Sequence, residues 1–132
     1  MFKRKLNVDA YTNLIVAGTE INGNLVFTGV MFIQGTFSGA TIAAIKEKSP
    51  DDALNVGEGG VVNADSVTAT NVVVSGTLTA KTIRAEDTVR ILGNGTIRDA
   101  IIYYRTLEIQ PGTLLHNCIL KHLDYCSEGE VV

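Results

Sequence analysis

NVVVSGTLTAKTI, the stretch from residue 71 to residue 83, shows the pattern that decides the fold. Apolar residues, many of them β-branched, alternate with polar ones at a period of two, which is typical of strands with one buried face. Gly76 interrupts this alternation, where the chain is expected to turn a corner. Nowhere in the sequence do apolar residues recur at helical spacing for more than about one turn. The sequence therefore predicts short strands joined by glycine-containing corners.

Stretches of the same kind recur along the whole chain. The anchors of the repeat are the apolar residues Ile15, Ile33, Val56, Val74, Ile91 and Ile109, separated by 18, 23, 18, 17 and 18 residues. The long interval contains the polar insertion 46–52, which has the composition of a loop. A period near 18 divides into three sides of about six residues, and stacked coils of this kind bury their apolar residues only against neighbouring coils. We predict an all-β chain forming a triangular β-helix (solenoid) of about six coils, with a β-sandwich as the alternative.

Length and composition favour a single domain of this kind. The chain has 132 residues, of which 45% are hydrophobic but only 6% aromatic, so a thin core of β-branched residues is expected. The predicted coils occupy residues 14–123, between flexible tails at 1–13 and 124–132. No secretory signal and no run of 18 apolar residues is visible, which predicts a cytoplasmic protein.

The charges are distributed unevenly. Lys3, Arg4 and Lys5 are three of the eleven basic residues, so the chain from Leu6 onward has eight basic and fourteen acidic side chains, a net charge of −6. A body of this sign lacks the basic stripe that would meet phosphates, and we expect no nucleic-acid partner.

Residues able to carry out chemistry are few, and we predict no catalytic, cofactor or metal site. His116 and His122 lack a third ligand, and Cys118 and Cys126 lack zinc-site spacing and are expected to be reduced thiols. The adjacent carboxylates at 51–52 and 86–87 are expected at solvated corners, since neighbours on a strand face opposite sides. The enzyme alternative is a trimeric left-handed β-helix of the hexapeptide-repeat acyltransferase or carbonic-anhydrase type.

The series of repeats resembles the bactofilin family of bacterial cytoskeletal proteins. The stretches that carry this resemblance are 21–25, 33–39, 56–62, 72–78 and 100–112, and it extends over about residues 14–120. The resemblance implies a right-handed β-helix that assembles end to end, without nucleotide, into non-polar filaments. It also implies a location on the cytoplasmic face of the inner membrane and partners among the proteins of cell-wall synthesis or remodelling.

The N-terminus fits this resemblance as well. Met1, Phe2, Lys3, Arg4, Lys5 and Leu6 are similar to the short tail with which many bactofilins bind membrane. This similarity implies anionic membrane lipid as a partner.

The C-terminal end departs from the family pattern. The family commonly has Phe after a Gly turn here, whereas Leu115 stands at the matching position and Asn117 replaces a corner glycine. Asn can adopt the left-handed conformation that Gly would, so the corner is expected to persist.

The ends of the predicted coil are the expected contact between copies. An open β-helix exposes unpaired strand edges at both ends unless they are capped, and no helical cap is recognisable in this sequence. Uncapped ends are expected to add strands from another copy. The residues predicted for this polymerisation interface are Leu114, Leu115 and Ile119 at one end and Leu14 and Ile15 at the other.

Overall fold

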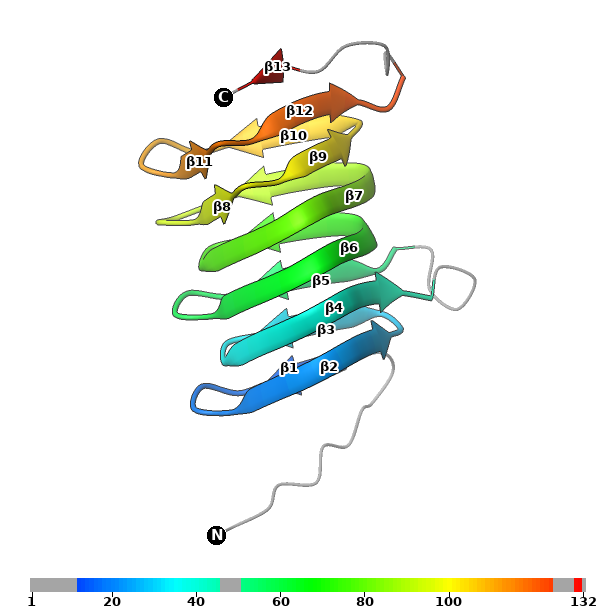
Figure 1. The fold of residues 1–132 in the computed structure, drawn as a ribbon, viewed down its shortest axis with the longest axis vertical. Helices are drawn as coiled ribbons and strands as arrows, with labels where there is room; N and C mark the ends of the chain where they lie inside the picture. Colours follow the sequence, from blue (N-terminus) through cyan, green and yellow to red (C-terminus); the bar gives the residue numbers. More distant parts are fainter. Residues whose placement is uncertain (1–11, 46–50, 125–129, 132) are drawn as a thin grey trace, which may run out of the picture.

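The computed structural model describes residues 12–45, 51–124 and 130–131, and these form thirteen strands and no helix (Figure 1). In chain order the strands are β1 (Thr12–Ile15), β2 (Glu20–Phe27), β3 (Val30–Ile33), β4 (Thr36–Ala44), β5 (Ala53–Val56), β6 (Val61–Val74), β7 (Thr77–Ile91), β8 (Thr96–Arg98), β9 (Ile101–Tyr104), β10 (Thr106–Ile109), β11 (Leu114–His116), β12 (Ile119–His122) and β13 (Glu130–Val131). The described residues contain no helix long and apolar enough to cross a membrane.

Strands β1 to β12 stack in parallel into one sheet that winds around three sides, and β13 adds to it in the antiparallel direction. The first side holds the starts of β2, β4, β6 and β7, followed by β8 and β11. The second side holds the later parts of β2 and β4, the middles of β6 and β7, then β9 and β12. The third side holds β1, β3, β5, the ends of β6 and β7, and β10. The predicted triangular β-helix of about six coils is therefore confirmed.

The winding is right-handed. In Figure 1 the nearer strands β2 and β4 run from left to right while the chain rises from the N-terminal end, and the fainter strands behind them return. This is the opposite hand to that of the enzyme alternative, which is a left-handed β-helix.

The register of the third side follows the sequence repeat. Ile15 pairs with Ile33, Ile33 with Val56 and Val56 with Val74. Val74 in turn pairs with Ile91, which pairs with Ile109. Every anchor of the repeat therefore lies directly over the next. Between the two ends the column is fully buried, because each coil covers the apolar residue of the coil below.

One corner between the first and second sides requires glycine. A Cβ atom built on Gly39 would lie 1.7 Å from the carbonyl oxygen of Gly23 in the coil below, a distance at which the two backbones must move apart. Gly23 itself has a φ of 119°, in the region that favours glycine. The two coils approach this closely because Gly39 lacks a side chain, whereas Gly23 is required for its backbone conformation, since a Cβ atom there would meet no neighbour.

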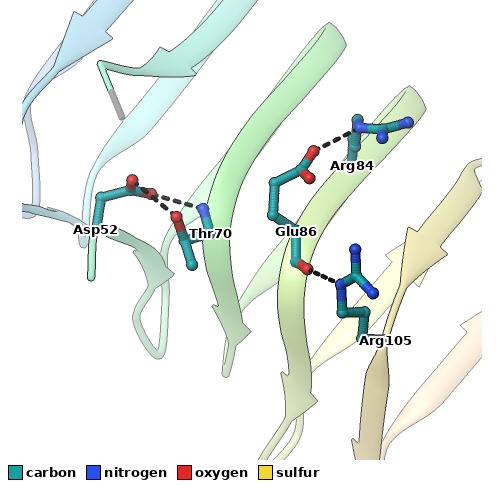
Figure 2. Close-up of polar contacts among 5 residues, drawn as sticks. All are labelled: Asp52, Thr70, Arg84, Glu86 and Arg105. Carbon is teal, nitrogen blue, oxygen red and sulfur yellow. Dashed lines mark hydrogen bonds and ion pairs between the residues drawn. The ribbon is translucent and has the colours of Figure 1, made fainter. Parts of the chain in front are cut away.

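The insertion between β4 and β5 ends at a buried carboxylate, which corrects the expectation that Asp51 and Asp52 both lie at a solvated corner. Asp51 is exposed, but Asp52 is fully buried. Its carboxylate accepts hydrogen bonds from the backbone N–H and the hydroxyl of Thr70, at 2.6 and 3.0 Å (Figure 2). Thr70 lies at a register shift, where the strand ladder skips a residue. The Asp52 side chain therefore supplies an acceptor where the ladder is interrupted.

The neighbouring carboxylate pair belongs to the same row of corners. Glu86 is half-buried and forms an ion pair with Arg84, whereas Asp87 is exposed. Arg105, one coil further along, donates from Nε to the carbonyl oxygen of Glu86 at 2.9 Å (Figure 2). Arg105 also forms an ion pair with Asp124. The two contacts of Arg105 connect successive coils at the corner, whereas the Arg84–Glu86 ion pair lies within one coil.

Candidate assembly interface

Both ends of the coil present strand edges. At the N-terminal end no described strand lies below β2 on the first two sides or below β1 on the third. At the C-terminal end none of the described strands lies above β11 on the first side or β10 on the third (Figure 1). The outer N–H and C=O groups of such edges are available for pairing with a further strand.

Apolar side chains of the core reach the N-terminal end. Ile21 pairs in register with Phe37 and Leu25 with Ile42, so both occupy inward-facing columns of the core. Phe37 and Ile42 are fully buried, whereas Ile21 and Leu25 are only partly buried, because no coil of the described residues covers them. A strand added below β2 would complete their burial.

The C-terminal end shows the same arrangement. Ile109 lies over Ile91 on the third side, but Ile91 is fully buried and Ile109 is 45% exposed. Leu115 lies over the buried Ile97 on the first side and is itself partly buried, as is Leu107 of β10. The two open sides of this end therefore combine strand edges with unburied core residues.

The residues predicted for the interface all lie in the first or last coil, but they face different ways. Leu115 is an inward residue at the open end, and Ile15 is an inward residue of β1 that is 5% exposed. Leu14 and Leu114 occupy the alternate, outward positions of β1 and β11, and Leu114 is 47% exposed. Ile119 lies outward on β12, over Ile101.

Four inward residues that are incompletely buried at the ends were not predicted: Ile21, Leu25, Leu107 and Ile109. The sequence did carry a signal for Ile109, since it is the last anchor of the repeat and the last member of a stacked column has no coil above it. Ile21 and Leu25 belong to the first coil of their sides, and the same reasoning applied to the start of the repeat would have identified them.

The corner that follows β11 is formed without glycine, as predicted. Asn117 has a φ of 57°, in the left-handed region. Asp99, one coil below, has a φ of 59°, and the Asn117 amide donates to its carboxylate at 3.0 Å. Short polar side chains tolerate this conformation better than other non-glycine residues. Leu115 is therefore followed by an ordered turn into β12.

A strand covers part of the C-terminal end. β13 pairs with β12 on the second side, with Ile119 opposite Val131 and Leu120 opposite Glu130, and Figure 1 shows it lying over the last coil. The sequence shows no helical cap, and it did not predict this strand. Leu120 faces inward on the covered side and is only 7% exposed, in contrast to Ile109 on the uncovered third side.

The histidines and Cys118 have separate surroundings in the described part of the chain. His116 is exposed, while His122 packs edge-on against Tyr104 with ring centroids 5.3 Å apart. Cys118 is a buried free thiol. Among the residues described, no three His, Cys, Asp or Glu side chains gather as metal ligands. Cys126 and the predicted membrane-binding residues 1–6 lie outside the described ranges.

Comparison with known proteins identifies the family. A family model described as "Bactofilin: Polymer-forming cytoskeletal" matches residues 13–118, which include β2 to β11. No curated protein and no solved structure is significantly similar to the chain. The matched region is the parallel solenoid whose two open ends were described above. This chain belongs to the bactofilin family of polymer-forming cytoskeletal proteins.

Proposed function

We propose that this chain is the subunit of a filament that grows by end-to-end addition of further subunits, without nucleotide or metal. The observation that supports this proposal is the coincidence of open strand edges with unburied core residues at both ends, such as Leu25 at one and Ile109 at the other. A second copy that continued the sheet would satisfy the edges and bury these side chains in one step.

The free energy of association requires that the contact between two copies extend over the whole end of the coil. Fully burying one Leu or Ile contributes about 1.5–3 kcal/mol, and residues that are already partly covered, such as Leu115 and Ile109, contribute less. Association costs about 4–15 kcal/mol in lost freedom. A few side chains therefore do not suffice, and ladder hydrogen bonds of about 0.5–1.5 kcal/mol each must form along more than one side.

The proposed filament is non-polar, so that like ends meet, and it lies on the cytoplasmic face of the bacterial inner membrane. The basic tail from Met1 to Leu6 attaches it to anionic lipid, and the filament organises proteins of cell-wall synthesis or cell shape. These parts of the proposal rest on the family to which the chain belongs and on the composition of its tail.

Negative-stain electron microscopy of the purified chain tests the proposal. Filaments should form at micromolar concentration in buffer with EDTA, and addition of ATP or GTP should not change their number or length. A closed particle of fixed subunit number, measured by light scattering under the same conditions, would contradict end-to-end growth.

A further inference from the structure

β13 differs from every other described strand in its direction. The eleven other strand pairings of the described residues are parallel, as stacked coils require, whereas β13 runs antiparallel to β12. Its pairing is also short, since only Ile119 and Leu120 of the four-residue β12 have partners in it. β13 is thus not a further coil of the solenoid.

The direction of β13 is the one that a second copy would present at a junction between like ends. A two-fold axis perpendicular to the coil turns one terminal coil onto another and reverses the direction of each strand. The β12 strands of two copies brought edge to edge on the second side would therefore run antiparallel. A junction between unlike ends would instead continue the parallel order of the coils.

We infer that β13 occupies the edge of β12 at which a second copy adds, and that it must leave before the C-terminal ends can join over the second side. The inference rests on the proposed end-to-end assembly and adds to it a regulation of one end. β13 belongs to the same chain as β12, so its effective concentration at this edge does not change with the total protein concentration. The partner strand has four residues available for pairing against two in β13, so it displaces β13 as the protein concentration rises.

A pair of full-length variants separates the backbone pairing from the side chains of this segment. Glu130→Pro/Val131→Pro removes both N–H groups and prevents pairing with β12. Glu130→Ala/Val131→Ala makes the same change in charge but retains the N–H groups. The proline variant should assemble at a critical concentration at least about threefold below those of the alanine variant and the wild type, because a larger fraction of its ends is competent to bind. Light scattering over a dilution series measures this value.

A reversible crosslink tests the opposite effect. Cysteines at Ile119 and Val131, which are opposite each other in the register, would hold β13 in place when oxidised. Cys126→Ser removes the other thiol of the chain, and Cys118 stays in the core, fully buried. The oxidised variant should stop at short oligomers and form filaments after reduction, whereas Ile119→Cys/Val131→Ser should be insensitive to reductant.

The outcomes distinguish the inference from the proposed function. Equal critical concentrations for the proline, alanine and wild-type chains, or filaments from the oxidised crosslinked chain, would overturn the role of β13 and leave end-to-end assembly intact. Failure of both the wild type and the proline variant to assemble at any concentration, with a β-rich circular dichroism spectrum retained, would overturn both.

Discussion

At the scale of single residues, Asp52 holds the chain in place after the insertion between β4 and β5. Asp52 accepts two hydrogen bonds from Thr70 immediately before β5 begins. The backbone oxygen of Asp52 also accepts a hydrogen bond from the side-chain amide of Asn71 at 3.1 Å. Asp52 therefore joins the start of β5 to the next coil at a position where the strand ladder is interrupted.

Asp52→Ala should destabilise the fold, because it leaves the Thr70 N–H without its acceptor in a part-buried position. A loss of about 1–3 kcal/mol in the free energy of unfolding is expected. Urea denaturation followed by circular dichroism measures it, in an assembly-deficient background so that polymerisation does not add to the apparent stability.

Two neighbouring substitutions serve as controls for Asp52. Asp52→Asn retains an oxygen that can accept from Thr70 and should lose less stability than Asp52→Ala. Asp51→Ala removes an exposed carboxylate and should lie within about 0.5 kcal/mol of the wild type. Equal stability of Asp52→Ala and Asp51→Ala would show that the buried carboxylate does not stabilise this coil.

Residues could be predicted from the sequence where their role depends on the repeat. The register of the anchors from Ile15 to Ile109 follows from spacing alone, and Asn117 could be assigned a left-handed conformation because it takes the place of a corner glycine. The burial of Asp52 could not, since it depends on Thr70 at a register shift 18 residues away. A pair of adjacent aspartates next to Pro50 has the composition of a solvated loop whichever of them is buried.

At the scale of elements, β11 is the strand on which the account of the C-terminal end is most easily tested. Leu115→Arg places a charge in an inward column at the open end, where it stays hydrated in the free subunit but is desolvated in a junction. Desolvation costs several kcal/mol, so the critical concentration should rise by at least about a hundredfold while the subunit remains β-rich. Electron microscopy and circular dichroism together measure both effects.

Leu114→Arg is the matched control, because Leu114 is the preceding residue of the same strand but faces outward and is 47% exposed. It should retain filaments with a smaller change in critical concentration. Long filaments from Leu115→Arg, or an equal loss of assembly in both variants, would contradict the assignment of Leu115 to the junction.

The sequence predicted the elements inside the repeat better than those at its end. Alternation with a period of two identified β6 and β7, which together extend over all three sides of the coil. The pattern is clear there because each residue that faces inward must be apolar or small. β13 has only two residues, in a segment rich in Ser, Gly and Glu, and so it shows no periodicity. It exists through its pairing with the edge of β12, a tertiary contact that no local pattern encodes.

At the scale of the whole molecule, the tail and the filament are expected to act together. Burial of Phe2 at a bilayer interface contributes about 2 kcal/mol. Each of Lys3, Arg4 and Lys5 adds about 1 kcal/mol near anionic lipid. About 5 kcal/mol in total corresponds to an association constant of only about 10³–10⁴ M⁻¹. A single subunit with a body of net charge −6 should barely bind, whereas a filament with many tails gains avidity.

Sedimentation with anionic vesicles tests this expectation. Wild-type filaments should pellet with the vesicles, and less so at high salt, which screens the basic residues. Deletion of residues 2–6 should abolish pelleting but leave filaments intact, and the Leu115→Arg subunit should also remain in the supernatant. Filaments without the tail that pelleted as well as the wild type would show that the tail is not the membrane anchor.

The measurement that tests the central claim most directly is cryo-electron microscopy of filaments formed without nucleotide. Continuation of the sheet from copy to copy predicts that strands stack along the filament axis at about 4.8 Å, and that each subunit of about six coils advances the filament by about 29 Å. Junctions between like ends further predict a repeat of two subunits. Coils lying across the filament axis and joined side by side, with Ile21, Leu25, Ile109 and Leu115 still exposed to solvent, would contradict the account.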